Sequence, residues 1–122
     1  MGLILVVDDE RDIRILAADI IKTLGHTPIL SPDGQHAYEL LKVNDSIDLL
    51  ITDIFMPKMD GRELIRKFRG NNEHSKIPIL AMSGYISHKE IPTLFDLGAD
   101  AFLDKPFSYN DFENIIRKLL KK

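Results

Sequence analysis

Three aspartates follow two short apolar runs in this 122-residue chain. The run 3–7 ends in Asp8 and Asp9, and the run 49–52 ends in Asp53. If these runs are neighbouring parallel strands, the three carboxylates meet at one end of a sheet. Like charges held that close are unfavourable unless a cation offsets them, and carboxylate oxygens are preferred ligands of Mg²⁺. The pattern therefore predicts a divalent metal site.

Two further polar residues fall where other strands are expected to end. Ser83 follows the run 78–82, and Lys105 lies two residues past the run 101–103. A divalent cation together with Lys105 would neutralise three carboxylates and leave the site ready for a phosphoryl group. Taken singly, each residue has an ordinary explanation as a turn hydroxyl, a surface cation or a helix cap. Their joint occurrence favours a functional site.

The elements that must position these residues follow a regular alternation. Short apolar runs alternate with amphipathic stretches, which predicts a parallel sheet with helices on both faces. The expected strands are 3–7, 27–30, 49–52, 78–82 and 101–103, and apolar periodicity marks helices around 13–24, 37–41, 64–68, 91–95 and 112–120. In such a sheet, ligands bind beyond the carboxyl ends of the strands. All the polar residues named above are expected at that edge.

Three local signals refine the helix ends. Asp60 and Glu63 have the spacing of a capping box that opens the third helix, and Ser108 is expected to cap the last one. Pro92 falls within the first turns of the fourth helix, where it removes a backbone donor. We therefore expect the fourth helix to start late or irregularly.

Composition limits the class of function. The net charge of -3, from 19 acidic and 16 basic residues, gives no basic excess for binding nucleic acid directly. The absence of cysteine excludes disulfides and thiolate metal sites and suits a reducing compartment. The first apolar run is too short for a signal peptide or a membrane span. We expect one domain over residues 1–122, without a membrane segment, in the cytoplasm.

The ordered set of motifs resembles the receiver domain of two-component response regulators over essentially the whole chain. The resemblance rests on VDDE at 7–10, TDIFMPKMDG at 52–61, MSG at 82–84 and GADAFLDKPF at 98–107. Each fragment is weak alone, but their order and spacing are highly specific. The resemblance implies an α/β, flavodoxin-like, doubly wound sheet of five parallel strands in the order 2-1-3-4-5, with five helices.

The resemblance also implies roles for the polar residues. Asp53 would accept a phosphoryl group from the histidine of a sensor histidine kinase or a histidine phosphotransfer protein. Mg²⁺ would be held by Asp8, Asp9, Asp53 and the backbone carbonyl of Phe55. Lys105 would pair with the phosphoryl group. Such a domain is not a classical enzyme, because it catalyses only its own phosphorylation and dephosphorylation.

Ser83 and Phe102 would form the switch. In the family, the hydroxyl at the Ser83 position moves toward the phosphoryl group. A swing of the aromatic at the Phe102 position then remodels the face made by the fourth helix, fifth strand and fifth helix. The output partner is unknown, and a homodimer formed on phosphorylation is left open. The Lys105–Pro106 bond is expected to be cis.

Two departures from the family pattern give hypotheses of their own. Phe55 and Tyr85 lie two residues beyond Asp53 and Ser83, where family members tune the access of hydrolytic water. Neither side chain offers a carboxylate or an amide to orient that water, which predicts a long-lived phosphoryl group. Pro92 should loosen the start of the fourth helix and make the output face mobile before phosphorylation.

Three other functions compete with phosphoacceptor signalling. An aspartate-nucleophile phosphatase pairs its nucleophile with a second acid two residues on, and that position holds Phe55 here. A flavodoxin-like cofactor binder needs a loop that binds phosphate after its first strand. Here that position holds the acidic segment 8–10, which would repel a phosphate. A receiver-like interaction module that is never phosphorylated remains as the alternative. The sequence leaves open the cognate kinase, and whether this is a single-domain regulator or part of a larger regulator or hybrid kinase.

Overall fold

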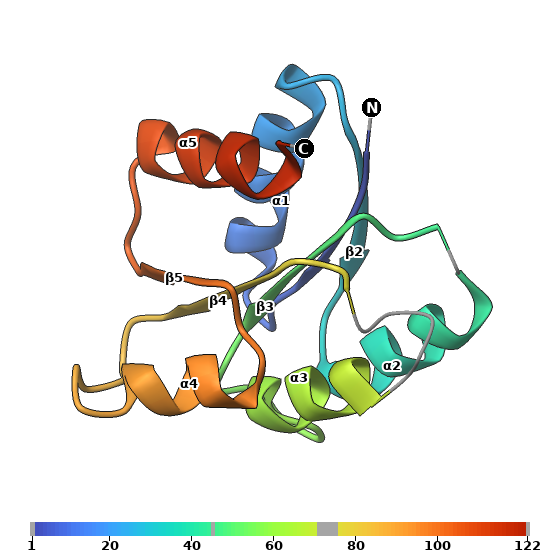
Figure 1. The fold of residues 1–122 in the computed structure, drawn as a ribbon. Helices are drawn as coiled ribbons and strands as arrows, with labels where there is room; N and C mark the ends of the chain where they lie inside the picture. Colours follow the sequence, from blue (N-terminus) through green and yellow to red (C-terminus); the bar gives the residue numbers. More distant parts are fainter. Residues whose placement is uncertain (1, 45, 71–75, 122) are drawn as a thin grey trace.

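The computed structural model describes residues 2–44, 46–70 and 76–121. Within these ranges, strands and helices alternate along the chain (Figure 1). The strands are β1 (Leu3–Val7), β2 (Thr27–Ser31), β3 (Leu49–Asp53), β4 (Ile79–Ser83) and β5 (Ala101–Asp104). The helices are α1 (Arg11–Thr23), α2 (Gly34–Val43), α3 (Gly61–Gly70), α4 (Ile91–Leu97) and α5 (Tyr109–Leu120). The elements predicted from the sequence are thus all present.

The sheet is parallel throughout and has the order β2-β1-β3-β4-β5, which confirms the expected fold class. Asp53 and Ser83 each form the last residue of their strand. The register pairs Val7 with Thr52 and Ser83 with Asp104. The carboxyl ends of β1, β3, β4 and β5 therefore align at one edge. Strand order reverses between β1 and β3, which is where ligands bind in this class of sheet.

Two hydrophobic layers cover the sheet, because alternate side chains of each strand point to opposite faces. Ile4 and Val6 pack on one face in a cluster with residues of α1 and α5. Leu5 and Val7 pack on the other face in a cluster with residues of α2, α3 and α4. Figure 1 shows α1 and α5 on one side of the sheet and the other three helices on the opposite side. The central strands β3 and β4 are buried along their whole length.

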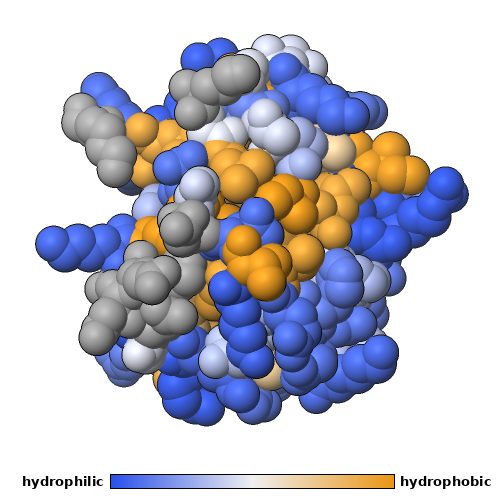
Figure 2. All heavy atoms as spheres, turned by 90° about the vertical axis from the view of Figure 1, so that its right-hand side faces the viewer, coloured by the Kyte–Doolittle hydropathy of each residue, from blue (hydrophilic) through white to orange (hydrophobic). Residues whose placement is uncertain are grey.

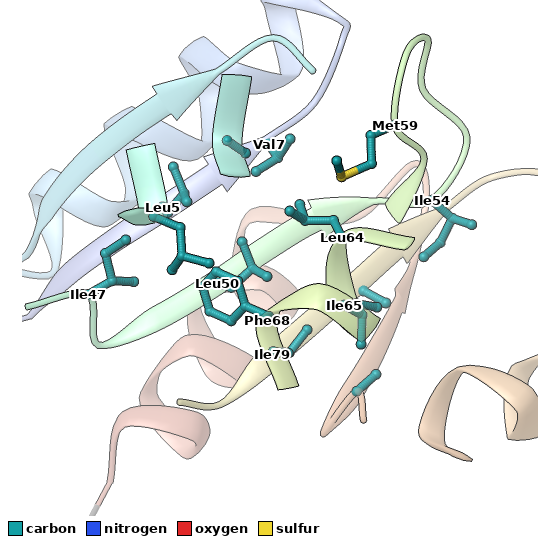
Figure 3. Packing of buried hydrophobic residues seen from close by; sticks show 14 of the residues in the cluster. Leu5, Val7, Ile47, Leu50, Ile54, Met59, Leu64, Ile65, Phe68 and Ile79 are labelled. Carbon is teal, nitrogen blue, oxygen red and sulfur yellow. The ribbon is translucent and has the colours of Figure 1, made fainter. Parts of the chain in front are cut away.

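The segment between β3 and α3 is anchored in the core at both ends. Ile54 and Met59 are both buried and belong to the cluster drawn in Figure 3. Gly61 opens α3 directly against the end of β3, where its N–H donates to the carbonyl of Ile54 at 2.7 Å. A Cβ at Gly61 would overlap the carbonyl oxygen of Asp53. This close approach, which only glycine allows, fixes the backbone around Asp53.

The helix ends follow the local signals in the sequence. The Oδ1 atom of Asp60 accepts hydrogen bonds from the backbone N–H groups of Arg62 and Glu63, at 2.9 and 3.2 Å. The Oγ atom of Ser108 accepts one from Asp111 at 3.0 Å. These bonds confirm Asp60 and Ser108 as N-caps, whereas the reciprocal bond from the Asp60 N–H to the Glu63 side chain, which would complete the capping box, is not among the hydrogen bonds of the described residues.

The fourth helix is short and has a weak start. It spans only seven residues, with Pro92 in its first turn and no side-chain hydrogen bond at its N-cap. Proline is tolerated there because the first N–H groups of a helix have no intrahelical acceptor. Gly98 ends the helix at a positive φ of 126°. The helix therefore begins without the capping that holds α2, α3 and α5.

The side of the molecule on which β2 and α2 lie carries an apolar band between hydrophilic surfaces (Figure 2). Exposed apolar residues on these two elements are Leu30, in the edge strand, and Val43, at the end of α2. No helix in the described part of the chain combines the length and apolar character that crossing a membrane requires.

Candidate functional site

The ammonium group of Lys105 lies between carboxylates that come from different parts of the chain. Its Nζ atom is 2.6 Å from Asp8 Oδ2, 3.2 Å from Asp53 Oδ2 and 3.3 Å from Glu10 Oε1. Only 11% of the Lys105 side chain is exposed, so its contacts with the buried Asp8 and Asp53 form away from bulk water. The ends of β1, β3 and β5 thus meet at this one cation, as the strand order predicts. The Lys105–Pro106 peptide bond is cis, as expected.

Asp8 divides its two oxygens between the backbone and the site. Oδ1 accepts a hydrogen bond from the N–H of Glu10 at 2.9 Å, which shapes the turn into α1. Oδ2 faces Lys105 but makes no hydrogen bond of good geometry within the described structure, despite the 2.6 Å separation. We regard this contact as an ion pair held by charge. A buried oxygen in that position is suited to a further cation.

The two carboxylate oxygens of Asp53 also have different partners, one in the backbone and one in the site. Its Oδ1 atom accepts a hydrogen bond from the N–H of Ile54 at 2.8 Å, and its Oδ2 atom faces Lys105. The residue is 6% exposed. One carboxylate oxygen is therefore fixed by the backbone, while the other lies beside the cation at the edge of the sheet.

Burial and crowding shift the acidity of these groups. Burial raises the pKa of Asp53 to about 6, with a contribution from the negative charge of Asp8 and opposition from Lys105. Burial also raises the pKa of Asp8, although Lys105 counteracts part of this effect. For Lys105, burial acts to lower the pKa, but the two aspartates outweigh it and raise the pKa overall. The cation therefore stays charged between carboxylates of reduced acidity.

A group of carboxylates at this edge offers oxygen ligands to a metal. Ligand oxygens of Asp8, Glu10 and Asp53 all lie within 4.8 Å of one another. Such an all-oxygen set, with one buried oxygen that lacks a good hydrogen bond, fits a hard divalent cation such as Mg²⁺. Asp9 is exposed and is not a member of this group. Its role as a metal ligand stays a prediction, as does that of the Phe55 carbonyl.

Glu10 is the member of this group that the sequence reasoning did not single out as a site residue. It immediately follows the two aspartates, so the acidic run itself was the available signal. Its contact with Lys105 joins residues 95 positions apart. Only the folded arrangement of the two loops reveals that contact.

The two proposed switch residues lie near this edge in different environments. Ser83 is fully buried, and its Oγ atom accepts a hydrogen bond from the N–H of Tyr85 at 3.0 Å. This is the turn role that a serine takes in ordinary loops, yet it leaves the O–H of Ser83 able to donate. Phe102 is half-buried in β5 and packs against the core cluster of the α2, α3 and α4 face.

The residues expected to tune hydrolysis are both accessible. Phe55 is 39% exposed, and the guanidinium carbon of Arg62 lies 5.2 Å from the centre of its ring. Tyr85 is 87% exposed. It lines a hollow of about 390 Å³ together with Glu10, Lys105 and three others, Ile13, Gly84 and Pro106.

Comparison with known proteins connects this geometry to a family. The family sequence model of the response regulator receiver domain matches residues 4–117 of this chain. Transcriptional regulatory protein CpxR of Escherichia coli strain K12 is 33% identical over 122 residues, which is all of this chain and 50% of CpxR. A CheY homolog of Campylobacter jejuni, a chemotaxis protein, is 33% identical over 106 residues, covering 86% of this chain and 82% of that protein. The chain thus spans about half the length of CpxR.

Solved structures agree with the sequence comparison. Chemotaxis protein CheY4 of Vibrio cholerae superposes with a TM-score of 0.92 at 26% identity, covering 98% of this chain and 99% of that one. The receiver domain of a histidine kinase from Syntrophus aciditrophicus gives a TM-score of 0.89 at 27% identity, covering 98% and 90%. Family model, relatives and fold all agree. The chain therefore belongs to the response regulator receiver domains of two-component signalling systems.

Proposed function

We propose that residues 1–122 act as one receiver domain in which Asp53 accepts a phosphoryl group from a kinase histidine or a histidine phosphotransfer protein. The observation that carries this proposal is the placement of Asp53 Oδ2, 3.2 Å from Lys105 Nζ at the switch point of the sheet. The carboxylate is held by a backbone N–H on one side, so its second oxygen is directed to the site.

The transfer requires Asp53 in its charged form. With a pKa of about 6, Asp53 is mainly a carboxylate at neutral pH and can act as a nucleophile. Its oxygen forms a bond to phosphorus while the bond from phosphorus to the histidine nitrogen breaks, and that nitrogen departs with the electron pair. Lys105 offsets the negative charge of the incoming phosphoryl oxygens. Phosphoryl transfer depends mainly on such positioning and charge neutralisation.

Mg²⁺ is the cofactor that the proposed mechanism requires. Asp8, Asp9, Asp53 and the carbonyl of Phe55 would hold it, and the group of carboxylates at Lys105 supports the assignment of Asp8 and Asp53. When bound, the metal neutralises phosphoryl oxygens. Without it, the three carboxylates that contact Lys105 exceed the charge of that single cation.

The output of the domain would pass through Ser83 and Phe102. Ser83 is buried at the end of β4 and has an O–H that can turn toward a phosphoryl oxygen on Asp53. Phe102, on the neighbouring strand β5, is not fully buried and can exchange its packing. The face made by α4, β5 and α5 would then change for an output partner or for a second phosphorylated copy. The acidic net charge supports protein partners rather than nucleic acid. The lack of cysteine suits a reducing compartment such as the cytoplasm.

Incubation with Mg²⁺ and a small phosphodonor, followed by intact mass measurement, tests the acceptor. The wild-type chain should gain one phosphoryl group, and Asp53→Ala should gain none. Asp104→Ala is a matched control, because Asp104 is an exposed aspartate at the end of β5, and it should be labelled like the wild type. An adduct that survives Asp53→Ala would overturn the assignment. A wild-type chain that never gains an adduct would favour the unphosphorylated interaction module.

A further inference from the structure

Glu10 is a third carboxylate on Lys105, and the mechanism above does not use it. Its Oε1 atom lies 3.3 Å from Lys105 Nζ, and 61% of its side chain is exposed. The other two carboxylates on the same cation are almost entirely covered, with 0% of the Asp8 side chain and 8% of the Asp53 side chain exposed. Among the three, Glu10 is thus the one that faces solvent.

Glu10 and Lys105 also line the same hollow of about 390 Å³. The rest of that lining consists of Ile13, Gly84, Tyr85 and Pro106, none of which carries a charge at neutral pH. Within this lining, Lys105 is therefore the cation and Glu10 the anion. A negatively charged molecule that enters the hollow to reach Lys105 must come close to the carboxylate of Glu10.

We propose that Glu10 determines specificity by making the site discriminate between phosphodonors according to their charge. The inference rests on the proposed function, in which Asp53 accepts the phosphoryl group and Lys105 pairs with its oxygens. For that pairing, Lys105 must exchange its contact with Glu10 for one with the donor. The freed carboxylate then repels the donor and any anionic leaving group.

Two donor classes differ in this respect. An acyl phosphate carries two negative charges at neutral pH, and when its bond from phosphorus to oxygen breaks it leaves as a carboxylate anion. A phosphoramidate is protonated on nitrogen and carries a net single negative charge. When its bond from phosphorus to nitrogen breaks, it leaves as a neutral amine that keeps its protons. Glu10 therefore opposes the acyl phosphate both as it enters and as its leaving group departs. It favours nitrogen-linked donors that leave as neutral bases, such as phosphoramidate or a phosphohistidine protonated on the second nitrogen of its imidazole.

Initial phosphorylation rates of Glu10→Gln and the wild type, measured with acetyl phosphate and with phosphoramidate at saturating Mg²⁺ and low ionic strength, test the inference. A unit charge at close range in a solvent-exposed site changes a rate several-fold, and the effect scales with donor charge. Glu10→Gln should thus increase the phosphorylation rate by about tenfold with acetyl phosphate and by about threefold with phosphoramidate. The difference should shrink at high salt, because exposed charges are screened.

Two control variants separate charge from mere contact. Glu39→Gln removes the same charge from an exposed position on α2 and should change neither rate. Glu10→Asp keeps the charge but shortens the side chain, so it should keep the wild-type ratio of the two rates. If Glu10→Asp instead behaves like Glu10→Gln, Glu10 acts by holding Lys105 in place and the proposal is wrong.

The outcomes distinguish this proposal from the assignment of Asp53. If Glu10→Gln increased the phosphorylation rates with both donors equally, or increased neither, the proposed role of Glu10 would be wrong. Asp53 would still be the acceptor. A wild-type chain that gains no adduct from either donor would overturn both proposals together.

Discussion

Lys105 and Asp8 form an ion pair of 2.6 Å between Nζ and Oδ2, in which the carboxylate is fully buried. Asp53 lies beside this pair, and its own Oδ2 atom shares the same cation at 3.2 Å. The single positive charge of Lys105 thus offsets the charges of two buried carboxylates. Such an arrangement is costly to keep fully ionised, because burial penalises each charge and the carboxylates repel each other. The charges required at this site therefore lower the stability of the folded protein.

Asp53→Asn should stabilise the Mg²⁺-free protein at neutral pH. Burial raises the pKa of Asp53 from its ordinary value of 3.8 to about 6, so the folded state holds this proton more tightly than the unfolded state. Wild-type stability should consequently fall as pH rises from about 4 to about 6, and then level off. The asparagine variant lacks this loss, which corresponds to about 1 to 3 kcal/mol.

Chemical denaturation of both proteins at pH 4, 6 and 8 checks this expectation. The advantage of Asp53→Asn should be absent near pH 4 and complete by pH 8. Adding Mg²⁺ should stabilise the wild type by mass action and reduce the difference. A wild type that is the more stable protein at pH 8 without metal would contradict the argument.

Lys105→Met should destabilise the protein strongly, because it leaves two buried carboxylates without their cation. Truncating one partner of a buried ion pair costs about 3 kcal/mol or more. The loss in the free energy of unfolding should be larger at pH 8 than at pH 5, since the carboxylates of raised pKa accept protons at the lower pH. Urea denaturation at both values measures it.

Lys42→Met is the matched control for this prediction. Lys42 pairs with Glu39 at 3.6 Å, and 51% and 58% of the two side chains are exposed. A solvent-exposed pair of this kind contributes less than about 1 kcal/mol. If Lys42→Met proved as damaging as Lys105→Met, the loss at Lys105 could not be assigned to its buried carboxylates.

The order of strands explains why so much of this site could be predicted from the sequence. Asp53, Ser83 and Lys105 each lie at or just past the end of an apolar run. Once the runs form a parallel sheet, the carboxyl ends share one edge and these residues must converge there. Convergence of strand ends requires no knowledge of side-chain conformation. The structure accordingly brings Asp8, Asp53 and Lys105 together.

The acidic segment after β1 shows where sequence reasoning stops. Asp8, Asp9 and Glu10 are equivalent as acids, yet only the first is buried. The turn into α1, closed by the hydrogen bond from the N–H of Glu10 to Asp8 Oδ1, decides which of them faces Lys105. The direction of each side chain in a turn depends on backbone torsions that residue type alone does not determine. The contact between Glu10 and Lys105 was therefore not predictable.

Backbone amides of α4 should exchange with solvent faster than those of α1. Neither helix has a side-chain cap, but α4 has only seven residues and a single buried side chain, that of Leu94. By contrast, α1 spans 13 residues and buries four, Ala17, Ala18, Ile20 and Ile21. Segments with few buried contacts open at lower free energy, so exchange in α4, including its start around Pro92, should be at least about tenfold faster than in α1. Hydrogen exchange followed by NMR measures both helices, and equal protection would show that the output face is not mobile before phosphorylation.

Phe55→Asn should shorten the lifetime of the phosphoryl group on Asp53. Phe55 is 39% exposed two residues beyond the acceptor, and its ring offers no group that could hold an attacking water. An amide in this position can orient that water toward phosphorus, and we expect dephosphorylation to accelerate by on the order of tenfold. The rate follows from loss of the phosphorylated mass after the donor is removed.

Phe55→Leu separates the amide from the loss of the aromatic ring. The ring lies 5.2 Å from the guanidinium carbon of Arg62, so any substitution also removes that contact. If the amide orients water, Phe55→Asn accelerates dephosphorylation and Phe55→Leu stays close to the wild type. If both variants accelerate equally, the ring protects the phosphoryl group by covering it. If Phe55→Asn left the dephosphorylation rate unchanged, residue 55 would not control the lifetime of the phosphoryl group.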